Sequence, residues 1–300
     1  MAEPVCLVPS GDWTGEGALW HAAEHALYWV DVNRFLIHRL DYAARTTRTW
    51  FFTEPPTALG LTDRPGTLVV ALASRVILWQ PQNDARADFA VPEKGWPKVR
   101  SNDARPDPAG NFWLGTMQNN VADDGSDIPI TDNTLGKLFR IDAKGAFTVE
   151  KAGISIANTV CWSPDSRRFY FADTLKNAIS VWDYDFATGT IANERPFFTG
   201  FERGSPDGSA VDSAGYLWNA RYGGGCVVRV APDGHVDRVV ELPCKAVTTC
   251  TFGGPDLRTL FITTAGGGRG SVNGEQLAGG LFALGVQTPG LPENVFRLGS

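Results

Sequence analysis

Residues 204–222, with the sequence GSPDGSAVDSAGYLWNARY, contain the pattern that predicts the fold. Asp207 precedes a short apolar run, and five residues later Asp212 opens the turn Asp-Ser-Ala-Gly. Eleven residues after Asp207, Trp218 begins an aromatic, apolar segment. Short apolar segments separated by turns rich in Pro, Asp and Gly are typical of antiparallel β-strands. This stretch therefore predicts two neighbouring strands joined by a tight turn.

The same register recurs along the whole chain without a gap. Its first position falls at six residues: Glu16, Ala58, Asn102, Asn158, Asp207 and Thr249. Eleven residues after each of them lies an apolar segment, at Leu27, Val69, Trp113, Phe169, Trp218 and Leu260. Repeats of about 40–50 residues that each contain several strands are typical of β-propeller blades. We therefore predict an all-β fold, a six-bladed β-propeller, that forms a single domain over residues 1–300.

Two further apolar segments complete the expected unit of four short strands. The third segments lie at residues 35–41, 75–80, 137–142, 178–185, 226–232 and 280–286. A fourth segment often follows, at residues 47–52, 147–151, 195–200 and 236–242. Four such strands, joined by turn residues, predict one antiparallel blade. No stretch shows sustained helical periodicity, so we expect almost no helix.

A propeller must close its ring, and a strand from one terminus can complete the last blade. Residues 4–10, PVCLVPS, and residues 294–300, NVFRLGS, are the candidates, and the sequence does not say which lies outermost. Two segments interrupt the repeat, residues 118–136 and residues 266–279. We expect both to be surface loops, where specificity usually resides.

Composition excludes several classes of function. The net charge is −6 and no basic run is present, which argues against nucleic acid or a membrane as a partner. Five cysteines without metal-type spacing, and an N-terminus without a signal-peptide pattern, favour a reducing cytoplasm. No apolar run approaches the ~20 residues of a membrane helix. We expect a cytoplasmic monomer or weak oligomer that acts on a small molecule.

The first position of the register is predicted to mark the site. In a propeller the first strands of all blades line the channel in one direction, and we expect this position to precede them. The six residues should therefore converge at one mouth of the channel. Four of them carry carboxylate or amide oxygens: Glu16, Asn102, Asn158 and Asp207. Oxygen ligands suit Ca²⁺, Mg²⁺ or Mn²⁺ more than zinc, although Zn or Fe stays possible.

A purely local explanation competes with this one. Asn and Asp are favoured where a strand leaves a turn, because their side chains bond the nearby backbone. Glu16 resists that explanation, since Glu is not a turn former and here lies between two glycines. The set as a whole favours a site.

Four stretches carry a resemblance to a known family. They read GEGALW at 15–20, RSNDARPDPAGNFWLGTM at 100–117, ISIANTVCWSPD at 154–165 and SPDGSAVDSAGYLWNA at 205–220. The chain resembles the senescence-marker-protein-30/gluconolactonase family, whose members include regucalcin-like proteins and are six-bladed propellers. The resemblance covers essentially the whole chain.

This resemblance implies a role for particular residues. It implies one divalent metal held by Glu16, Asn158 and Asp207, with Asp207 also the general base. It implies that Arg100 and Asn102, with Asn120, hold the hydroxyls of a sugar lactone. Some members carry an acidic residue shortly after Gly-Thr-Met that touches the substrate, whereas here the segment is Gln118-Asn119-Asn120. The sugar preference therefore cannot be transferred.

Three functions remain open on the sequence alone. The first is a metal-dependent sugar lactonase, which opens an aldonolactone to the aldonic acid in sugar oxidation. Such a reaction needs a Lewis acid at the carbonyl and a carboxylate to take a proton, and the residues above fit. The second is another esterase or a phosphotriesterase on the same scaffold, favoured by a more apolar mouth. The third is a propeller without enzymatic activity that binds Ca²⁺ or a protein partner.

Overall fold

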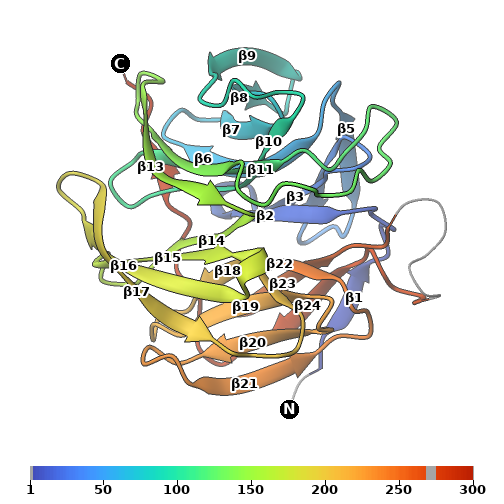
Figure 1. Cartoon of the computed structure of the whole chain (residues 1–300). Helices are drawn as coiled ribbons and strands as arrows, with labels where there is room; N and C mark the ends of the chain where they lie inside the picture. The colour runs from blue at the N-terminus through green and yellow to red at the C-terminus, as the bar shows by residue number, and fades with distance from the viewer. Residues whose placement is uncertain (1–2, 268–274, 300) are drawn as a thin grey trace.

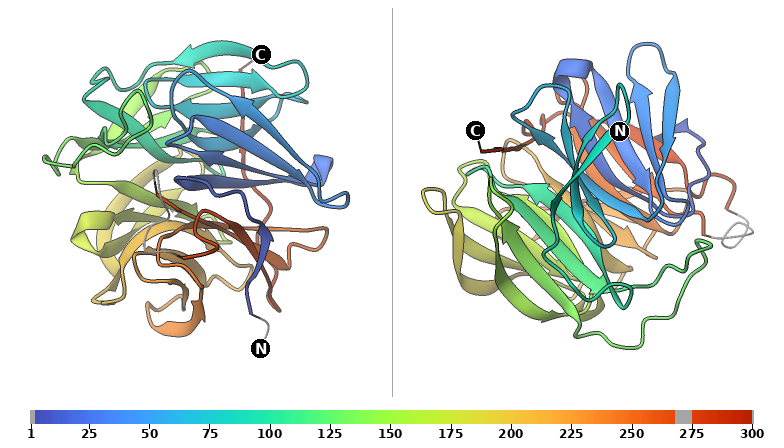
Figure 2. Two further views of the ribbon diagram at one scale, coloured as in Figure 1. Left: turned by 90° about the vertical axis from the view of Figure 1, so that its right-hand side faces the viewer. Right: turned by 90° about the horizontal axis from the view of Figure 1, so that it is seen from above.

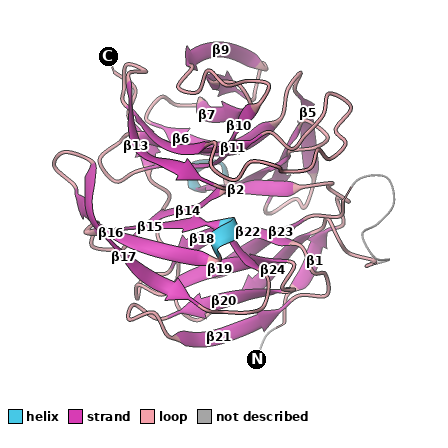
Figure 3. Ribbon diagram, viewed as in Figure 1, coloured by secondary structure: helices cyan, strands magenta, loops and turns pink. Residues whose placement is uncertain are grey.

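The computed structural model describes residues 3–267 and 275–299. It is an all-β, six-bladed propeller of antiparallel sheets, as the repeat predicts (Figure 1). Among the described residues the helices are two short 3₁₀ turns, η1 (Ala22–Glu24) and η2 (Thr174–Lys176) (Figure 3). None of the helices in this part of the chain has the length and apolar character needed to cross a bilayer.

Each of the first five blades contains four strands that are consecutive in the chain. The sixth combines three consecutive strands with one from the N-terminus. Blade 1 contains β2 (Gly15–His21), β3 (Ala26–Asp31), β4 (Leu36–Asp41) and β5 (Thr47–Phe51). Blade 2 contains β6 (Pro56–Thr62), β7 (Leu68–Leu72), β8 (Val76–Gln80) and β9 (Ala85–Ala90). Blade 3 contains β10 (Val99–Pro106), β11 (Phe112–Gln118), β12 (Gly136–Ile141) and β13 (Phe147–Ile154).

The second half of the chain repeats the arrangement. Blade 4 contains β14 (Ala157–Trp162), β15 (Arg168–Asp173), β16 (Ala178–Asp185) and β17 (Thr190–Thr199). Blade 5 contains β18 (Ser205–Val211), β19 (Leu217–Tyr222), β20 (Cys226–Val230) and β21 (Val236–Glu241). Blade 6 contains β22 (Val247–Gly253), β23 (Thr259–Thr264), β24 (Leu281–Gly285) and, from the other end of the chain, β1 (Val5–Val8).

The termini therefore play different parts in closing the ring. The N-terminal candidate supplies β1, which pairs with β24 as the outermost strand of blade 6. The C-terminal candidate does not complete that blade, so the structure decides the choice that the sequence left open. Its strand β25 (Val295–Phe296) pairs parallel to β6 in blade 2, with Val295 opposite Leu61. The last residues cross the molecule to reach this position (Figure 2, left).

The core consists of six apolar clusters, each between two neighbouring blades. Strand β7 shows why the strands have continuous apolar sequences. Leu68, Val70 and Leu72 pack toward blade 1, whereas Val69 and Ala71 pack toward blade 3. Both faces of such a strand are buried, so no polar alternation is expected.

In blades 3 and 5 the spacing of the sequence repeat has a direct structural cause. Trp218 Nε1 donates to Asp212 Oδ2 at 3.0 Å, and Trp113 Nε1 donates to Asp107 Oδ2 at 2.8 Å. The aspartate that opens the turn after the first strand thus binds the tryptophan at the start of the second strand. A buried indole N–H needs such a partner, and this fixes the interval between the two residues.

The first position of the register lies inside the first strand of each blade, and not before it as expected from sequence. In all six first strands the pairing with the second strand shifts register at or directly beside this position. Such a bulge places an extra residue in one strand and re-aims its side chain. The irregularity thus turns these side chains toward the channel.

Candidate active site

A cavity of about 440 Å³ lies at the end of the channel where the first strands begin. Four of the six register residues line it: Glu16, Asn102, Asn158 and Asp207. The other two, Ala58 and Thr249, are buried at the same level beside Gly17 and Gly208. Arg100 and Asn120, the remaining residues singled out in the sequence, also line this cavity. The fold thus brings all six candidate side chains into one space.

Two carboxylates face each other in the cavity, that of Asp207 buried and that of Glu16 partly buried. Burial and then the charge of Asp103 raise the pKa of Glu16 to about 8. Burial and then the charge of Glu16 raise the pKa of Asp207 well above its ordinary value, and Asp207 is only 7% exposed. The backbone N–H of Gly17, 2.9 Å from Glu16 Oε2, partly offsets the cost for Glu16. Without a nearby cation the pair therefore retains a proton, because two like charges cannot both ionise here.

Asn158 presents a third oxygen whose direction is fixed. Its Nδ2 donates to Thr174 Oγ1 at 2.9 Å, and Thr174 Oγ1 donates to the carbonyl of Pro206 at 2.8 Å. Because the amide nitrogen is engaged on that side, Oδ1 turns toward the cavity, where Asn102 Nδ2 lies 3.1 Å away. Pro206 directly precedes Asp207, so Thr174 connects Asn158 to the backbone next to Asp207.

These three residues fit a hard divalent cation. In the part of the chain that the structure describes, no group of three or more His, Cys, Asp and Glu side chains is placed to hold a metal. The candidate ligands Glu16, Asp207 and Asn158 instead offer two carboxylates and one amide. All three donate oxygen atoms, which suit Ca²⁺, Mg²⁺ or Mn²⁺. A divalent charge would also remove the conflict between the two carboxylates.

Arg100 and its partners form the wall beside the carboxylates. The guanidinium donates from Nε and Nη2 to Asn120 Oδ1, at 2.9 and 2.6 Å, and from Nη1 to Asn102 Oδ1 at 2.8 Å. Burial lowers the pKa of Arg100 to about 10, although the charges of Glu16, Asp207 and Asp127 oppose that shift. Arg100 therefore remains a cation at neutral pH and orients both asparagines.

Asp103, which directly follows Asn102, lies outside the cavity lining. Its Oδ2 accepts the backbone N–H of Val160 at 3.1 Å, and burial raises its pKa. Its charge acts on both Glu16 and Asp207. The structure thus places Asp103 beneath the carboxylate pair, anchored to the neighbouring blade.

Sequence reasoning missed the residues that follow the second strands. Because each second strand runs antiparallel to the first, its end returns to the same mouth of the channel. These positions, about 15 to 18 residues after the register positions, supply part of the lining: Asn33, Thr174, Tyr222 and Ala265, together with Asn120, which the sequence had singled out. Extending the repeat by this interval would have found the other four. Three of those four are polar, Asn33, Thr174 and Tyr222.

The segment 118–136 forms one wall of the cavity. Gln118 accepts the backbone N–H groups of Thr131 and Asp132, at 2.9 and 2.7 Å, which folds the segment back on itself. As a result Asp127, Ile128 and Ile130 line the cavity. Half of the other predicted loop, residues 268–274 of 266–279, lies outside the described residues, and Gly267 also lines the cavity.

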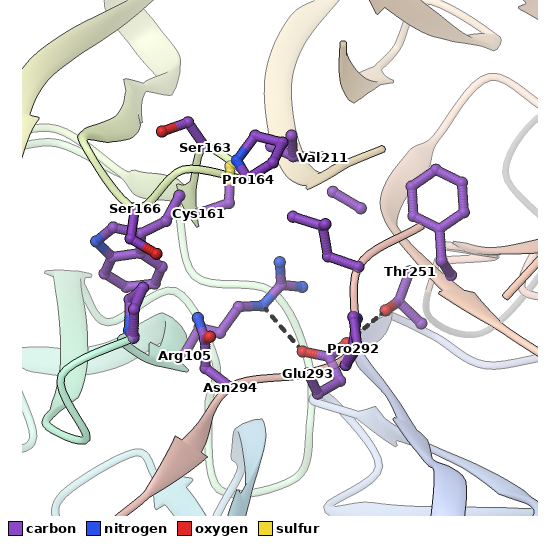
Figure 4. Close-up of a pocket in the computed structure, with 15 residues that line it drawn as sticks. Arg105, Cys161, Ser163, Pro164, Ser166, Val211, Thr251, Pro292, Glu293 and Asn294 are labelled. Atoms are coloured by element: carbon purple, nitrogen blue, oxygen red, sulfur yellow. Dashed lines mark hydrogen bonds and ion pairs between the residues drawn. The ribbon is translucent and has the colours of Figure 1, made fainter. Parts of the chain in front are cut away.

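A second cavity, of about 330 Å³, lies where the first strands end (Figure 4). Arg105 and Glu293 face each other in it, with Nε and Oε2 3.9 Å apart, and Glu293 Oε1 accepts the hydroxyl of Thr251 at 2.7 Å. Glu293 belongs to the C-terminal segment that crosses this end of the channel. The carboxylate of Glu293 is thus already paired. The described residues that line this cavity include no second carboxylate that could help to hold a divalent cation.

Fold and site together define a class: six-bladed propellers with a polar, oxygen-lined site at one mouth of the channel. Residues 14–266 match the family model described as SMP-30/Gluconolactonase/LRE-like region. The chain belongs to this family, whose relatives are named as sugar lactonases and regucalcins.

Three relatives show the extent of the similarity. The chain is 35% identical over 287 residues to pentonolactonase XacC of Haloferax volcanii, covering 93% of each chain. It is 34% identical over 298 residues to a 6-deoxy-6-sulfogluconolactonase of Pseudomonas putida, covering 97% of each. Among solved structures, a calcium-binding protein, regucalcin, from Agrobacterium tumefaciens is 29% identical with a TM-score of 0.89, covering 98% of this chain and 97% of the other.

Proposed function

We propose that the protein is a metal-dependent sugar lactonase that hydrolyses an aldonolactone to its aldonic acid. The observation that carries this proposal is the convergence in one cavity of two sets of groups. Glu16, Asp207 and Asn158 supply oxygen ligands, and Arg100 with its two asparagines supplies fixed polar groups for a polyol. The names of the lactonase relatives support the same reaction class.

The metal and the protein have separate tasks in this proposal. Glu16, Asn158 and Asp207 would hold a divalent cation, which would supply positive charge to polarise the lactone carbonyl and stabilise an oxyanion. Arg100 and Asn120 orient the ring, because Nδ2 of Asn120 has no hydrogen-bond partner among the described residues and can donate to a hydroxyl. The apolar side chains of Ile128 and Ile130 exclude water from the other side of the cavity.

Asp207 moves the proton in the chemical step. The oxygen of a water molecule bonds to the carbonyl carbon while the Asp207 carboxylate accepts a proton from that water. The bond between the carbonyl carbon and the ring oxygen then breaks, and the proton passes to the ring oxygen, which becomes a hydroxyl. The product is the open-chain acid, which ionises in water.

The test compares hydrolysis by protein stripped of metal and by protein reloaded with each divalent cation. Pentono- and hexonolactones of both ring sizes serve as substrates, and spontaneous opening is subtracted. We expect no enzymatic rate in chelator and recovery with at least one of Ca²⁺, Mg²⁺ or Mn²⁺. Full activity in chelator contradicts the metal-dependent mechanism, and absence of activity on every lactone contradicts the function.

One observation favours a second candidate on the same scaffold. Ile128, Ile130 and Ile156 give part of the cavity an apolar wall. An ester with an apolar group could lie against it, so aryl esters belong in the same panel. Preference for these over every aldonolactone would make the protein an esterase.

A further inference from the structure

The segment 118–136 brings one carboxylate to the rim of the cavity. Asp127 pairs with Val121 in an isolated antiparallel bridge, and the backbone N–H of Ile128 donates to the carbonyl of Asn120 at 2.8 Å. Asn120 thus holds the segment with its backbone and Arg100 with its side chain. Asp127 is therefore tied to the same residue that orients the guanidinium.

A residue of blade 1 fixes the direction of this carboxylate. Asn33 is 6% exposed, and its Nδ2 donates to Asp127 Oδ1 at 3.0 Å and to the carbonyl of Gly125 at 2.8 Å. The amide of Asn33 is oriented in turn by Thr14, whose Oγ1 donates to Asn33 Oδ1 at 2.7 Å. The Oδ2 atom of Asp127 has no hydrogen-bond partner among the described residues and remains available as an acceptor.

The close approach between the segment and blade 1 requires a glycine. Gly125 has a φ of 81°, and a Cβ atom there would lie 2.1 Å from the carbonyl oxygen of Asn33. A side chain at this position would push the segment away from Asn33 and so release Asp127. The contact thus depends on Asn33 of blade 1 and on Gly125 and Asp127 of the segment 118–136, about 90 residues further along the chain.

The charge of Asp127 acts on the open side of the cavity. It raises the pKa of Tyr222, after burial and the charge of Asp207, and it is among the charges that keep Arg100 protonated. Asp127 and Arg100 both line the cavity that a bound sugar would occupy, so the side chains of both can reach such a ligand.

We propose that Asp127 determines substrate specificity by accepting a hydrogen bond from a hydroxyl on the exocyclic end of the lactone. This inference rests on the proposed lactonase function and narrows its substrates to neutral, hydroxylated lactones. A hydroxyl that donates to a carboxylate forms a strong, charge-assisted bond. A carboxylate, sulfonate or phosphate in the same place meets a like charge and leaves Asp127 unpaired, and both effects select against it.

Two lactones that differ only at that end test the proposal. D-glucono-1,4-lactone ends in a hydroxymethyl group, and D-glucaro-1,4-lactone ends in a carboxylate on the same ring. We expect Asp127→Ala to lower kcat/KM for the first by about ten- to a hundredfold, as for loss of a charge-assisted hydrogen bond. We expect Asp127→Asn to raise kcat/KM for the second and so to change the ratio between the two lactones by at least about tenfold.

Asp123→Asn is the matched control. It removes the same charge from the same segment, but Asp123 is exposed and lines a different small cavity with Trp96. We expect its preference between the two lactones to equal that of the wild type. A ratio that stays the same in Asp127→Asn, or that shifts equally in Asp123→Asn, overturns the proposal.

Calorimetry that measures binding of the two lactones to metal-free protein, prepared with a chelator, separates this inference from the proposed function. In one outcome the wild type hydrolyses no lactone with any divalent cation, but it binds glucono-1,4-lactone more tightly than Asp127→Ala does. The proposed function then fails and the assignment of Asp127 stands. If the protein hydrolyses lactones and both Asp127 variants keep the wild-type preference in binding and turnover, the assignment fails and the function stands. Absence of both turnover and binding overturns both.

Discussion

Asn102 Nδ2 lies 3.1 Å from Asn158 Oδ1, and this contact joins the two halves of the candidate site. On one side, Asn102 Oδ1 accepts from Arg100 at 2.8 Å. On the other, Asn158 is held by Thr174, which also binds the carbonyl of Pro206, the residue before Asp207 in β18. A residue proposed to hold the sugar, Asn102, is therefore hydrogen-bonded to a residue proposed to hold the metal, Asn158. We expect a substitution in one group of residues to alter the position of the other.

Glu16→Gln should weaken metal binding and remove most of the activity. The substitution keeps the shape of the side chain but takes away one of two carboxylates, which a hard cation prefers over an amide. Metal content after gel filtration and titration of activity with the divalent cation measure the effect. Glu293→Gln, at the opposite end of the channel, is the matched control and should bind metal as the wild type does.

Asp207→Asn should abolish turnover at any lactone concentration. Loss of a proton acceptor alone lowers kcat by about a hundred- to ten-thousandfold, and weaker metal binding should deepen the defect. Steady-state kinetics with saturating metal measure it. A variant with nearly wild-type kcat would exclude Asp207 as the base. Rescue by metal alone would leave Asp207 as a ligand and make Asp103 the next candidate.

Arg100→Ala should act mainly on substrate binding. A hydrogen bond to a charged group contributes about 1.5–3 kcal/mol, so kcat/KM should fall by about ten- to a hundredfold. If the contact is equal in the ground state and the transition state, the loss appears in KM. Because Asn120 Oδ1 loses its partner as well, Asn120→Ala should reproduce part of the effect. A decrease confined to kcat would contradict a positioning role.

The metal-free protein should become less stable as pH rises. Glu16 has a pKa of about 8 in the folded protein against an ordinary value of 4.5, so the folded state holds a proton that the unfolded state has released. The free energy of unfolding therefore decreases between about pH 4.5 and 8. Thermal unfolding in chelator measures this slope, which should be smaller in Glu16→Gln. A divalent cation should reverse it, since its affinity rises as the proton leaves.

Asp212→Ala, a substitution outside the candidate site, should lower the free energy of unfolding. Asp212 is fully buried and accepts from Trp218 Nε1, from Arg229 and from the backbone of its own turn. Removing one partner of a buried charged pair costs about 3–5 kcal/mol. Urea unfolding measures the loss, with the exposed Asp256→Ala as a control that should change little. Equal stability of the two variants would contradict the role given to the Asp–Trp contact.

The sequence by itself determined the number of blades, the second and third strands, the fourth strand in four blades, and the residues that gather at one mouth. It did so because the blades repeat short-range arrangements; in blades 3 and 5, for example, a turn aspartate, Asp107 or Asp212, binds the tryptophan six residues later. Such contacts span few residues, so they leave a periodic trace in the chain.

Only the tertiary structure decided the features that join distant segments. The C-terminal strand β25 pairs in blade 2, and Asn33 binds Asp127 across the mouth. Neither of these repeats from blade to blade. Each depends on the ring bringing together segments far apart in sequence, and a contact made once over such a separation imposes no period that the sequence could reveal.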